Sequence, residues 1–382
     1  MKDEELQALR AEMDRADSEI LDLYLKRMAI VEKLADWKRR NHESLPLRER
    51  ERQTLVRIWE KAGSKFGPSA KALFSTIFEL ARTVDAETEV ADCPVAKNIE
   101  QALAEEPGEF PKHAKVACSG IPGAYAQIAA DRIFSLANIM YFNNFAGVFQ
   151  AVERGLCDYG VLPIENSTTG TVDAVCDLMK NYNFHIVRST RLHVTHTLLA
   201  KRGATLEGLK EVVSHEQGLK QCANFLNARP NLRLSVCPST ALAAKTVSES
   251  PRTDIAAIAS PECAEIYDLQ PLAKRIQNSD FNYTRFICIS KKMKIFPGAN
   301  RISVMTSLPH RSGSLYHLLA RFAALDLNLT KLESRPVPGS EFEYTFYFDF
   351  EASVRTPEVR RLLSDLAAAS KDFVFLGNYA EF

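Results

Sequence analysis

One helical stretch near the start of the chain constrains the fold more than any other part of the sequence. Apolar residues recur there at alternating spacings of three and four, the pattern of a long helix with one face packed against other helices. The positions on this face are Leu6, Leu9, Met13, Ala16, Ile20, Leu23, Arg27, Ile30, Leu34 and Trp37. Arg27 alone breaks the pattern. Because a guanidinium stays charged in proteins and is costly to bury unpaired, this position predicts an anionic partner.

The charge balance argues against several classes of partner. Lysine plus arginine and aspartate plus glutamate are equal at 48 each, so no overall field would collect nucleic acid or an anionic membrane, and a preference for anions must be local. The opening segment MKDEELQALR is charged and lacks the apolar core of a signal peptide. No later run approaches the ~18 apolar residues of a membrane span. We therefore expect a cytoplasmic protein with no nucleic-acid or membrane partner.

The eight cysteines are scattered singly along the chain. They lack the paired spacing of a zinc site and the pattern of a disulfide framework. We expect reduced packing residues and no metal.

The chain divides into three segments. Residues 1–90 read as helix throughout, with turns near NHESLP and KFGPS. A unit this short, with one very long helix, buries its apolar face poorly alone, so we expect two copies to intertwine in a homodimer or a higher homo-oligomer. Residues 91–112 mix a short helical stretch with proline, glycine and acidic residues, and are predicted to be a linker.

The remainder of the chain alternates strands and helices. Residues 113–292 predict an α/β domain, in one lobe or in two with a cleft between them. Residues 298–382 follow the order strand, helix, strand, strand, helix, strand, which is the ferredoxin-like α+β arrangement of a small separate domain. The expected protein is therefore multidomain, with all-α, α/β and α+β parts in that order.

Other charged side chains of the helical segment could join Arg27 in an anion site. Lys38 follows Arg27 by eleven residues and returns to within about 20° of the same helix face, whereas Arg10 lies about 100° away and could enter a partner's pocket. Arg50 and Glu51 belong to the next helix. Each of these alone is more simply a solvated helix charge. Several cations together with Arg27 suit a small molecule with two carboxylates, which guanidinium groups hold through paired hydrogen bonds.

The spacing of these residues resembles that of the all-helical chorismate mutases. The resemblance implies that the substrate is folded into a chair and that charge on its ether oxygen is stabilised. The residues implied to bind chorismate are Arg10, Arg27, Lys38, Arg50, Glu51 and Asp85. Three positions depart from the family: Leu47 replaces an aspartate, Ala81 a serine, and Asp85 a glutamine or glutamate. An ionised Asp85 would repel the substrate, so it would need a proton to donate to the ether oxygen.

Four motifs in the middle segment place polar residues between a strand and a helix: SGIPGAYAQIAA, PIENSTTGTV, SHEQGLKQC and PSTALAA. Each alone is more simply a helix cap, and we favour that role for His215 over a role as an acid. Together, at the carboxyl ends of strands, they suggest a site in a cleft. The glycines around Pro122 would offer backbone N–H groups to an anion.

With NYTRF, these motifs resemble prephenate dehydratase over residues 115–292, apart from Ala126, where the family commonly has serine. The resemblance implies that prephenate loses its ring hydroxyl and CO2 to give phenylpyruvate. Thr284 would be catalytic and polarise the leaving hydroxyl, while Arg285 would steer the charge of a carboxylate. The residues implied to bind prephenate are Asn166, Ser167, Thr168, Asn282 and Phe286.

In the last segment, RSGSLYHLL and ESRP resemble an ACT domain of the phenylalanine-sensing kind, with Ser314 in place of the usual alanine. Such domains pair and bind an amino acid between them. The residues implied to hold phenylalanine as an effector are Gly313, Ser314, Leu315, Glu333, Ser334, Arg335 and Pro336.

The favoured interpretation is a bifunctional chorismate mutase/prephenate dehydratase with a C-terminal ACT domain. It would need no cofactor, and its small-molecule partners would be chorismate, prephenate and phenylalanine. A first alternative is a dehydratase whose helical segment serves mainly to form dimers. A second is a non-catalytic amino-acid sensor, since two-lobed α/β clefts also act as binding modules. The intact TRF sequence argues against the sensor, and the departures at Leu47, Ala81 and Asp85 favour the first alternative.

Overall fold

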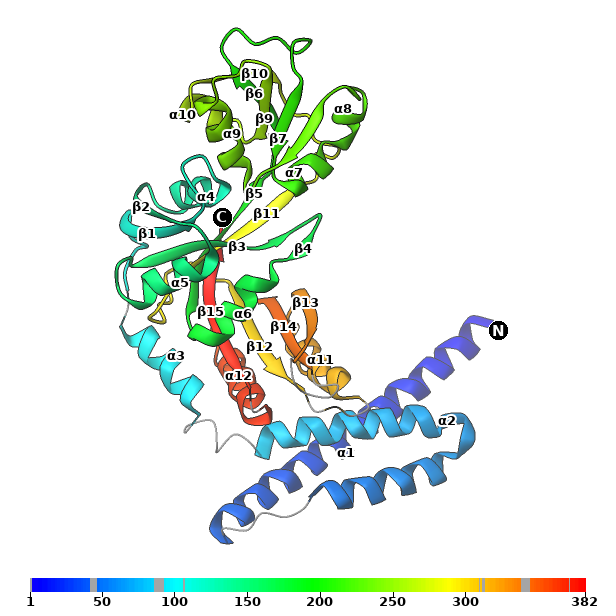
Figure 1. Ribbon diagram of the computed structural model, residues 1–382. Coiled ribbons are helices and arrows are strands. Elements are labelled where there is room, and N and C mark those ends of the chain that lie inside the picture. Colours follow the sequence, from blue (N-terminus) through cyan, green and yellow to red (C-terminus); the bar gives the residue numbers. More distant parts are fainter. Residues whose placement is uncertain are drawn as a thin grey trace.

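The structure is a computed structural model that describes residues 2–41, 47–85, 93–105, 107–308, 310, 313–337, 344–370 and 372–382. Figure 1 shows long helices at the base, the C-terminal strands above them, and a two-lobed body at the top.

The helical base consists of α1 (Lys2–Asn41) and α2 (Leu47–Asp85), and α2 is interrupted at Gly63. Gly63 has φ 67° and ψ 176°, a conformation that is strained for a residue with a Cβ atom, and Figure 1 shows α2 turning back on itself. The reversal at Gly63 confirms a turn between the second and third predicted helical arms, but the third arm begins before Ser69, because Pro68 lies inside it. The turn predicted near NHESLP falls on residues 42–46, outside the described residues.

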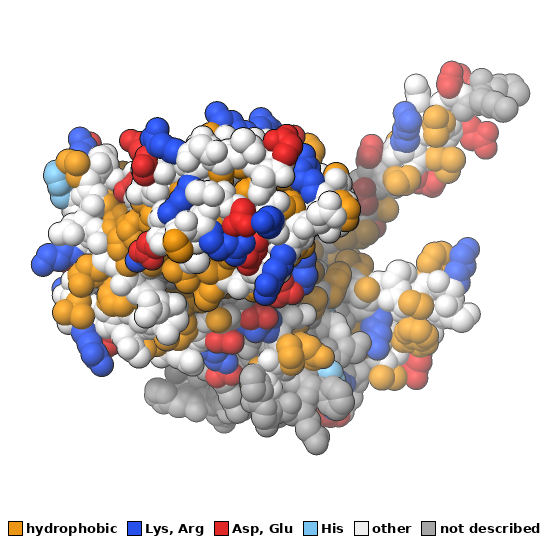
Figure 2. Space-filling model, turned by 45° about the horizontal axis from the view of Figure 1, so that its top comes forward, with side chains coloured by type: hydrophobic (Ala, Val, Ile, Leu, Met, Phe, Trp, Pro, Cys, Tyr) orange, Lys and Arg blue, Asp and Glu red, His pale blue; other side chains and the backbone are white. Residues whose placement is uncertain are grey.

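The apolar face of α1 is largely uncovered within one chain. Met13 and Leu23 are each 66% exposed, and burial is confined to positions such as Ala35 on α1 and Phe78 on α2. Figure 2 shows hydrophobic side chains on both projecting helical arms. Contiguous exposed apolar surface of this kind is typical of an interaction surface, and coverage by the helix of a second copy is the expectation from the sequence. The oligomer nevertheless stays a prediction.

The two-lobed body follows the prediction of an α/β domain with a mixed sheet. The strands of the first lobe are β1 (His113–Ser119), β2 (Leu136–Phe142), β3 (Tyr159–Asn166), β4 (Gly170–Thr171), β5 (His185–His193) and β11 (Tyr283–Ser290). Its helices are α4 (Tyr125–Ile133), α5 (Phe145–Glu153) and α6 (Asp173–Tyr182).

The second lobe has its own five-stranded sheet in the order β10-β6-β9-β7-β8. These strands are β6 (Thr197–Lys201), β7 (Glu211–Ser214), β8 (Arg233–Val236), β9 (Ile255–Ala259) and β10 (Leu269–Ala273). Its helices are α7 (Glu216–Gln221), α8 (Ala223–Asn227), α9 (Thr240–Glu249) and α10 (Cys263–Ile266). The chain crosses between the lobes after β5 and again after β10, so two connections join the two sheets.

The C-terminal domain has the predicted ferredoxin-like order. Its elements are β12 (Arg301–Ser307), α11 (Ser314–Ala324), β13 (Leu329–Pro336), β14 (Tyr344–Glu351), α12 (Pro357–Ala369) and β15 (Val374–Glu381). Its core gathers around Phe322, Phe348 and Phe350.

The prediction that this domain is a separate sandwich is wrong. Its sheet continues into that of the first lobe, in the order β13-β14-β12-β15-β5-β11-β3-β1-β2 with β4 also paired to β3, because Ala380 and Glu381 of β15 pair in parallel with Arg188 and Ser189 of β5. Gly377 permits this approach, since a Cβ atom there would lie 2.2 Å from the carbonyl oxygen of Ile186. The two domains therefore share one ten-stranded sheet.

The segment predicted as a linker also has a packing role. It contains α3 (Pro94–Ala104), whose Ile99 is fully buried in the core of the C-terminal domain, against residues such as Val359 of α12. A helix of this length that buries its apolar stripe gains stability from tertiary packing. Residues 93–105 are therefore part of the C-terminal domain.

Charged side chains of both signs are interspersed over the surface that Figure 2 displays. This distribution agrees with the balanced composition. None of the helices that the structure describes is long and apolar enough to cross a membrane.

Candidate active sites

A cavity of about 550 Å³ lies between the two lobes. The residues that line it from the first lobe include Ser119, Gly120, Tyr125, Asn144, Asn166, Thr284 and Phe286. The residues that line it from the second lobe include His215, Gly218, Gln221, Ser239 and Thr240. Four of the predicted strand-to-helix motifs therefore meet at one cleft. Among the described residues, no three His, Cys, Asp or Glu side chains gather as a metal ion would require.

Thr284 lies at the start of β11, opposite Asn166 at the end of β3. The Asn166 Nδ2 donates to the Thr284 Oγ1 at 2.8 Å. The Asn166 Oδ1 accepts from the backbone N–H of Thr168 at 2.9 Å and of Thr169 at 3.0 Å, which fixes the orientation of the amide. Since Thr284 accepts in its bond with Asn166, its own hydroxyl hydrogen can donate to a molecule in the cavity.

A hydrogen-bonded chain extends this pair into the second lobe. The Asn166 Nδ2 also donates to the Asn282 Oδ1 at 2.8 Å, and the Asn282 Nδ2 donates to the Gln221 Oε1 at 3.0 Å. The His196 Nε2 lies 2.7 Å from the same Gln221 oxygen. Since that oxygen only accepts, His196 donates through Nε2. The chain thus joins Thr284 to a helix of the opposite lobe.

Sequence analysis missed Gln221 and His196. Gln221 follows Gly218 by one helical turn within SHEQGLKQC, and both line the cavity, so the helical spacing was an available signal. His196 lies in the connection between β5 and β6, where no periodicity marks it.

His196 predicts a pH dependence of stability. Burial lowers the pKa of His196 from its ordinary value of 6.5, against the opposing effect of its hydrogen bond with Gln221. The unfolded chain therefore binds the proton more readily, and the free energy of unfolding should fall as pH drops below about 6.5, levelling off below the folded-state pKa. Urea unfolding between about pH 5 and pH 7.5 would measure this slope. His196→Gln should flatten it, and an unchanged slope in that variant would contradict the assignment.

The other predicted binding residues fall into two groups. Phe286 lines the cavity, and Asn282 accepts a hydrogen bond from Asn166, which also lines it. Ser167 instead donates to the carbonyl oxygen of Phe281 at 3.0 Å and accepts from the N–H of Tyr283 at 2.9 Å, so it braces the start of β11. Thr168 is exposed and contributes its backbone N–H to Asn166. Neither Ser167 nor Thr168 belongs to the lining of the cavity.

His215 has the predicted role as a cap. Its Nδ1 accepts from the N–H of Gln217 at 3.2 Å at the start of α7. The favoured interpretation of His215 is confirmed, although the residue also borders the cavity.

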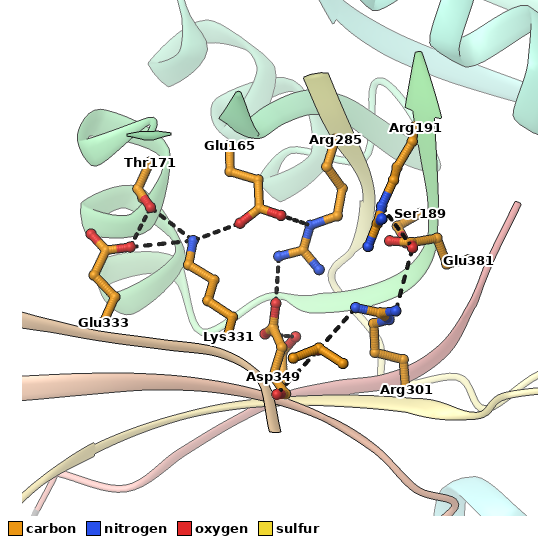
Figure 3. Close-up of polar contacts among 12 residues, drawn as sticks. Glu165, Thr171, Ser189, Arg191, Arg285, Arg301, Lys331, Glu333, Asp349 and Glu381 are labelled. Atoms are coloured by element: carbon orange, nitrogen blue, oxygen red, sulfur yellow. Dashed lines mark hydrogen bonds and ion pairs between the residues drawn. The ribbon is translucent and has the colours of Figure 1, made fainter. Parts of the chain in front are cut away.

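Arg285 does not line the interlobe cavity, contrary to its predicted contact with a substrate carboxylate. Adjacent residues of a strand point to opposite faces, so Thr284 and Phe286 face the cleft while Arg285 faces the C-terminal domain. Its side chain is 4% exposed, and its Nε lies 2.9 Å from the Glu165 Oε1. Its Nη2 bonds to Asp349 of β14. Figure 3 shows Arg285 between these two carboxylates.

Arg27, for which the sequence predicts an anionic partner, has a buried nitrogen that no described residue pairs. Its Cζ lies 5.1 Å from the centre of the Phe78 ring, and its buried Nη1 has no hydrogen-bond partner among the described residues. Burial lowers the pKa of Arg27, while Glu51 and Tyr24 raise it. A buried guanidinium nitrogen without a partner is available for an anionic ligand.

Of the predicted mutase residues, Glu51 lies close enough to Arg27 within one chain to raise its pKa. Arg10 and Arg50 are exposed, and Lys38 is half-buried. Figure 1 shows the amino-terminal end of α1, which carries Arg10, projecting away from the body. The side chains of Leu47 and Asp85 lie outside the part of the chain that the structure describes.

The predicted effector residues lie on two elements, β13 and the start of α11. Glu333 bonds to Thr171 of the first lobe, and the Arg335 Nη1 donates to the Asp177 Oδ1 at 2.9 Å. Ser334 and Pro336 occupy the alternate, exposed positions of β13. Residues 313–315 begin α11, beside the point where the Tyr316 hydroxyl lies 3.3 Å from the Thr76 Oγ1 of α2.

Comparison with known proteins assigns the family. The sequence profile of prephenate dehydratase matches residues 116–294, and that of chorismate mutase type II matches residues 9–86. Arogenate dehydratase/prephenate dehydratase 2, chloroplastic, of Arabidopsis thaliana is 39% identical over 277 residues, which are 69% of this chain and 72% of that protein. The chain belongs to the prephenate dehydratase family.

Two solved structures resemble this prephenate dehydratase family member with a TM-score of 0.64 and 28% identity each. One is the prephenate dehydratase of Arthrobacter aurescens in complex with L-Phe, and the match covers 70% of this chain and 89% of that one. The other is GqqA, described as a quorum-quenching acylase, with 70% of this chain and 98% of that one covered. The fold of the two-lobed and C-terminal domains thus serves more than one described activity, and the activity must be argued from the site.

Proposed function

We propose that the chain is a bifunctional enzyme that rearranges chorismate to prephenate in its helical segment and converts prephenate to phenylpyruvate, CO2 and water between its two lobes. The observation that carries the second activity is the Thr284 hydroxyl, which Asn166 holds as a hydrogen-bond donor at an interlobe cavity. The profile matches to both families support the combination.

The dehydratase reaction needs little covalent chemistry from the protein. The bond to the ring carboxylate breaks and releases CO2, its electron pair makes the ring aromatic, and the ring hydroxyl leaves and becomes water on taking a proton. Thr284 donates a hydrogen bond to the departing oxygen, where negative charge develops. The start of α4 has no side-chain cap and borders the cavity, so the backbone N–H groups of Tyr125 and Ala126 are available to a substrate carboxylate, whereas that of Gln127 bonds to the Ala124 carbonyl.

Separate assays with chorismate, prephenate and arogenate test this proposal. Arogenate carries an amine in place of the keto group of prephenate, and the names of the plant relatives include both substrates. We expect phenylpyruvate from prephenate and disappearance of chorismate in the same preparation. A protein inert toward both prephenate and arogenate would contradict the dehydratase. Turnover of prephenate without turnover of chorismate would favour the alternative in which the helices serve dimerisation.

The helical segment requires a second copy of the chain. Its apolar face is exposed in one copy, and Arg10 lies far from Arg27 along the same helix. In a homodimer, the α1 face would be covered and Arg10 of one copy could enter the pocket of the other. A cytoplasmic location and the absence of a nucleic-acid partner stay predictions.

We further propose that phenylalanine inhibits prephenate turnover by binding between paired C-terminal domains. The solved relative with L-Phe supports the choice of effector. Coupling between distinct sites typically amounts to about 5- to 150-fold, so millimolar phenylalanine should lower the initial rate within that range. Calorimetry should detect L-phenylalanine and not its D-enantiomer. Binding without inhibition would contradict the coupling.

The location of that site needs a point variant. Removing the chain after Lys294 would also remove β15, which pairs with β5 of the first lobe, so a truncated protein would lose more than regulation. Ser334→Lys adds bulk at an exposed position of β13 and should weaken phenylalanine binding while prephenate turnover continues.

A further inference from the structure

Two residues beside the dehydratase site point away from it. Arg285 follows Thr284 on β11, and Glu165 precedes Asn166 on β3. Both side chains turn toward the C-terminal domain, where Figure 3 shows them between Lys331 and Asp349. The neighbours of the two central cleft residues are therefore held by another domain.

The contacts form a continuous charged network. Arg285 bonds to Asp349, and its Nη1 lies 3.4 Å from the Tyr379 hydroxyl. The Lys331 Nζ lies 3.0 Å from the Glu165 Oε2. The Lys331 Nζ also donates to the Thr171 Oγ1 at 2.8 Å, in the hairpin that follows Asn166. The network therefore joins Lys331, Asp349 and Tyr379 of the C-terminal domain to Arg285, Glu165 and Thr171 of the first lobe.

The Arg285–Asp349 ion pair is buried, so breaking it is costly and it holds both side chains in place. The Arg285 and Asp349 side chains are 4% and 8% exposed. Burial opposes the charge on Arg285, but Tyr379, Asp349 and Glu165 more than offset it and raise its pKa. Removing one carboxylate from Arg285 leaves its buried charge less compensated, which is costly and favours a shift of Arg285 and the backbone that carries it.

On the side of β3, the backbone of β11 is less constrained at this point, whereas its pairing with β5 is regular from Tyr283 to Cys288. The pairing of β11 with β3 shifts register between Arg285 and Phe286, so the ladder of hydrogen bonds is disrupted next to Thr284. A bulge changes the direction of the side chains beside it, so other contacts are needed to fix their orientation. The contacts of Arg285 with the C-terminal domain supply that constraint.

We propose that Asp349 and Lys331 are positioning residues of the dehydratase, which act through Arg285 and Glu165 to hold Thr284 and Asn166 in their productive geometry. The inference rests on the proposed prephenate dehydratase activity. It makes β13 and β14 part of the catalytic apparatus, and it gives an effector bound to the C-terminal domain a physical route to the cleft. Displacement of these strands would change the rate of the chemical step more than the binding of substrate.

The test compares kcat and KM for prephenate in the full-length chain. Asp349→Asn should lower kcat between about 10- and 100-fold, the loss expected when a catalytic group is misplaced by about 1 Å, with KM changed less than about threefold. Lys331→Met should lower kcat in the same way. Glu351→Gln is the matched control, because it makes the same chemical change on β14 at an exposed residue that bonds to Asn328. It should leave kcat unchanged.

Two further measurements separate positioning from lost stability. Rates are divided by the folded fraction from circular dichroism, and Asp349→Glu, which keeps the carboxylate, should recover part of kcat. The double variant Asp349→Asn with Arg285→Gln should lose less than the product of the single losses, because both act through one contact. If Asp349→Asn fails to fold, Lys331→Met decides. Tyr379→Phe, which removes a hydroxyl that contacts both Arg285 and Ser303, should then lower kcat in the same direction.

The outcomes distinguish the inference from the function on which it rests. A wild-type chain inert toward prephenate would overturn the proposed function. An active wild type in which folded Asp349→Asn and Lys331→Met keep kcat within about threefold would overturn the positioning role alone.

Discussion

Replacing Thr284 with alanine should lower kcat for prephenate by about 100- to 1,000-fold, the usual loss when one donor to a developing negative charge is removed. The hydroxyl accepts from Asn166 and so directs its hydrogen into the cavity. Its contribution grows as the ring hydroxyl departs, and we therefore expect little change in the binding of prephenate.

Initial rates and binding titrations on Thr284→Ala and Thr284→Ser test this role. The serine variant keeps a hydroxyl and should retain much of the activity. Thr246→Ala is a suitable control, because its hydroxyl bonds only to the carbonyl oxygen of Leu242 within α9. A Thr284→Ala protein with kcat within tenfold of the wild type would remove Thr284 from the proposed mechanism.

Replacing Arg27 with methionine should lower chorismate turnover by about 100-fold or more, since a cation at the proposed dianion site is lost. The same change should leave stability unchanged or improved. The Arg27 Nη1 is buried without a hydrogen-bond partner among the described residues, and burial lowers its pKa. An apolar side chain of similar length removes that uncompensated charge and keeps contact with Phe78.

Chorismate assays and thermal unfolding measure the two effects together. Arg15→Met is the matched control on the same helix, where the arginine is exposed and bonds to the carbonyl oxygen of Ala11. It should change neither quantity. Wild-type turnover of chorismate that survives in Arg27→Met would contradict the proposed mutase site. Loss of prephenate turnover in Arg27→Met would show that the helical segment acts on the second site as well.

Features that depend on residues near one another in the chain could be predicted from the amino-acid sequence. Helical periodicity predicted α1 and the isolated charge of Arg27. The order of strands and helices predicted the ferredoxin-like C-terminal domain. Polar residues at strand ends predicted a site in a cleft and the cap at His215, because a cap satisfies backbone groups only two or three residues away. The roles of Asn166 and Thr284 came from the resemblance to prephenate dehydratase.

The orientation of these elements and their contacts with one another depend on tertiary packing. Alternation along β11 requires Arg285 to oppose Thr284, but which face borders the cleft depends on strands that are distant in the sequence. The pairing of Ala380 with Arg188 and the contact of Arg285 with Asp349 join residues from different domains. Periodicity along the sequence cannot predict such pairings, because they form when separate elements bury their remaining surfaces against one another. The connection between the catalytic cleft and the C-terminal domain is therefore a property of the assembled sheet.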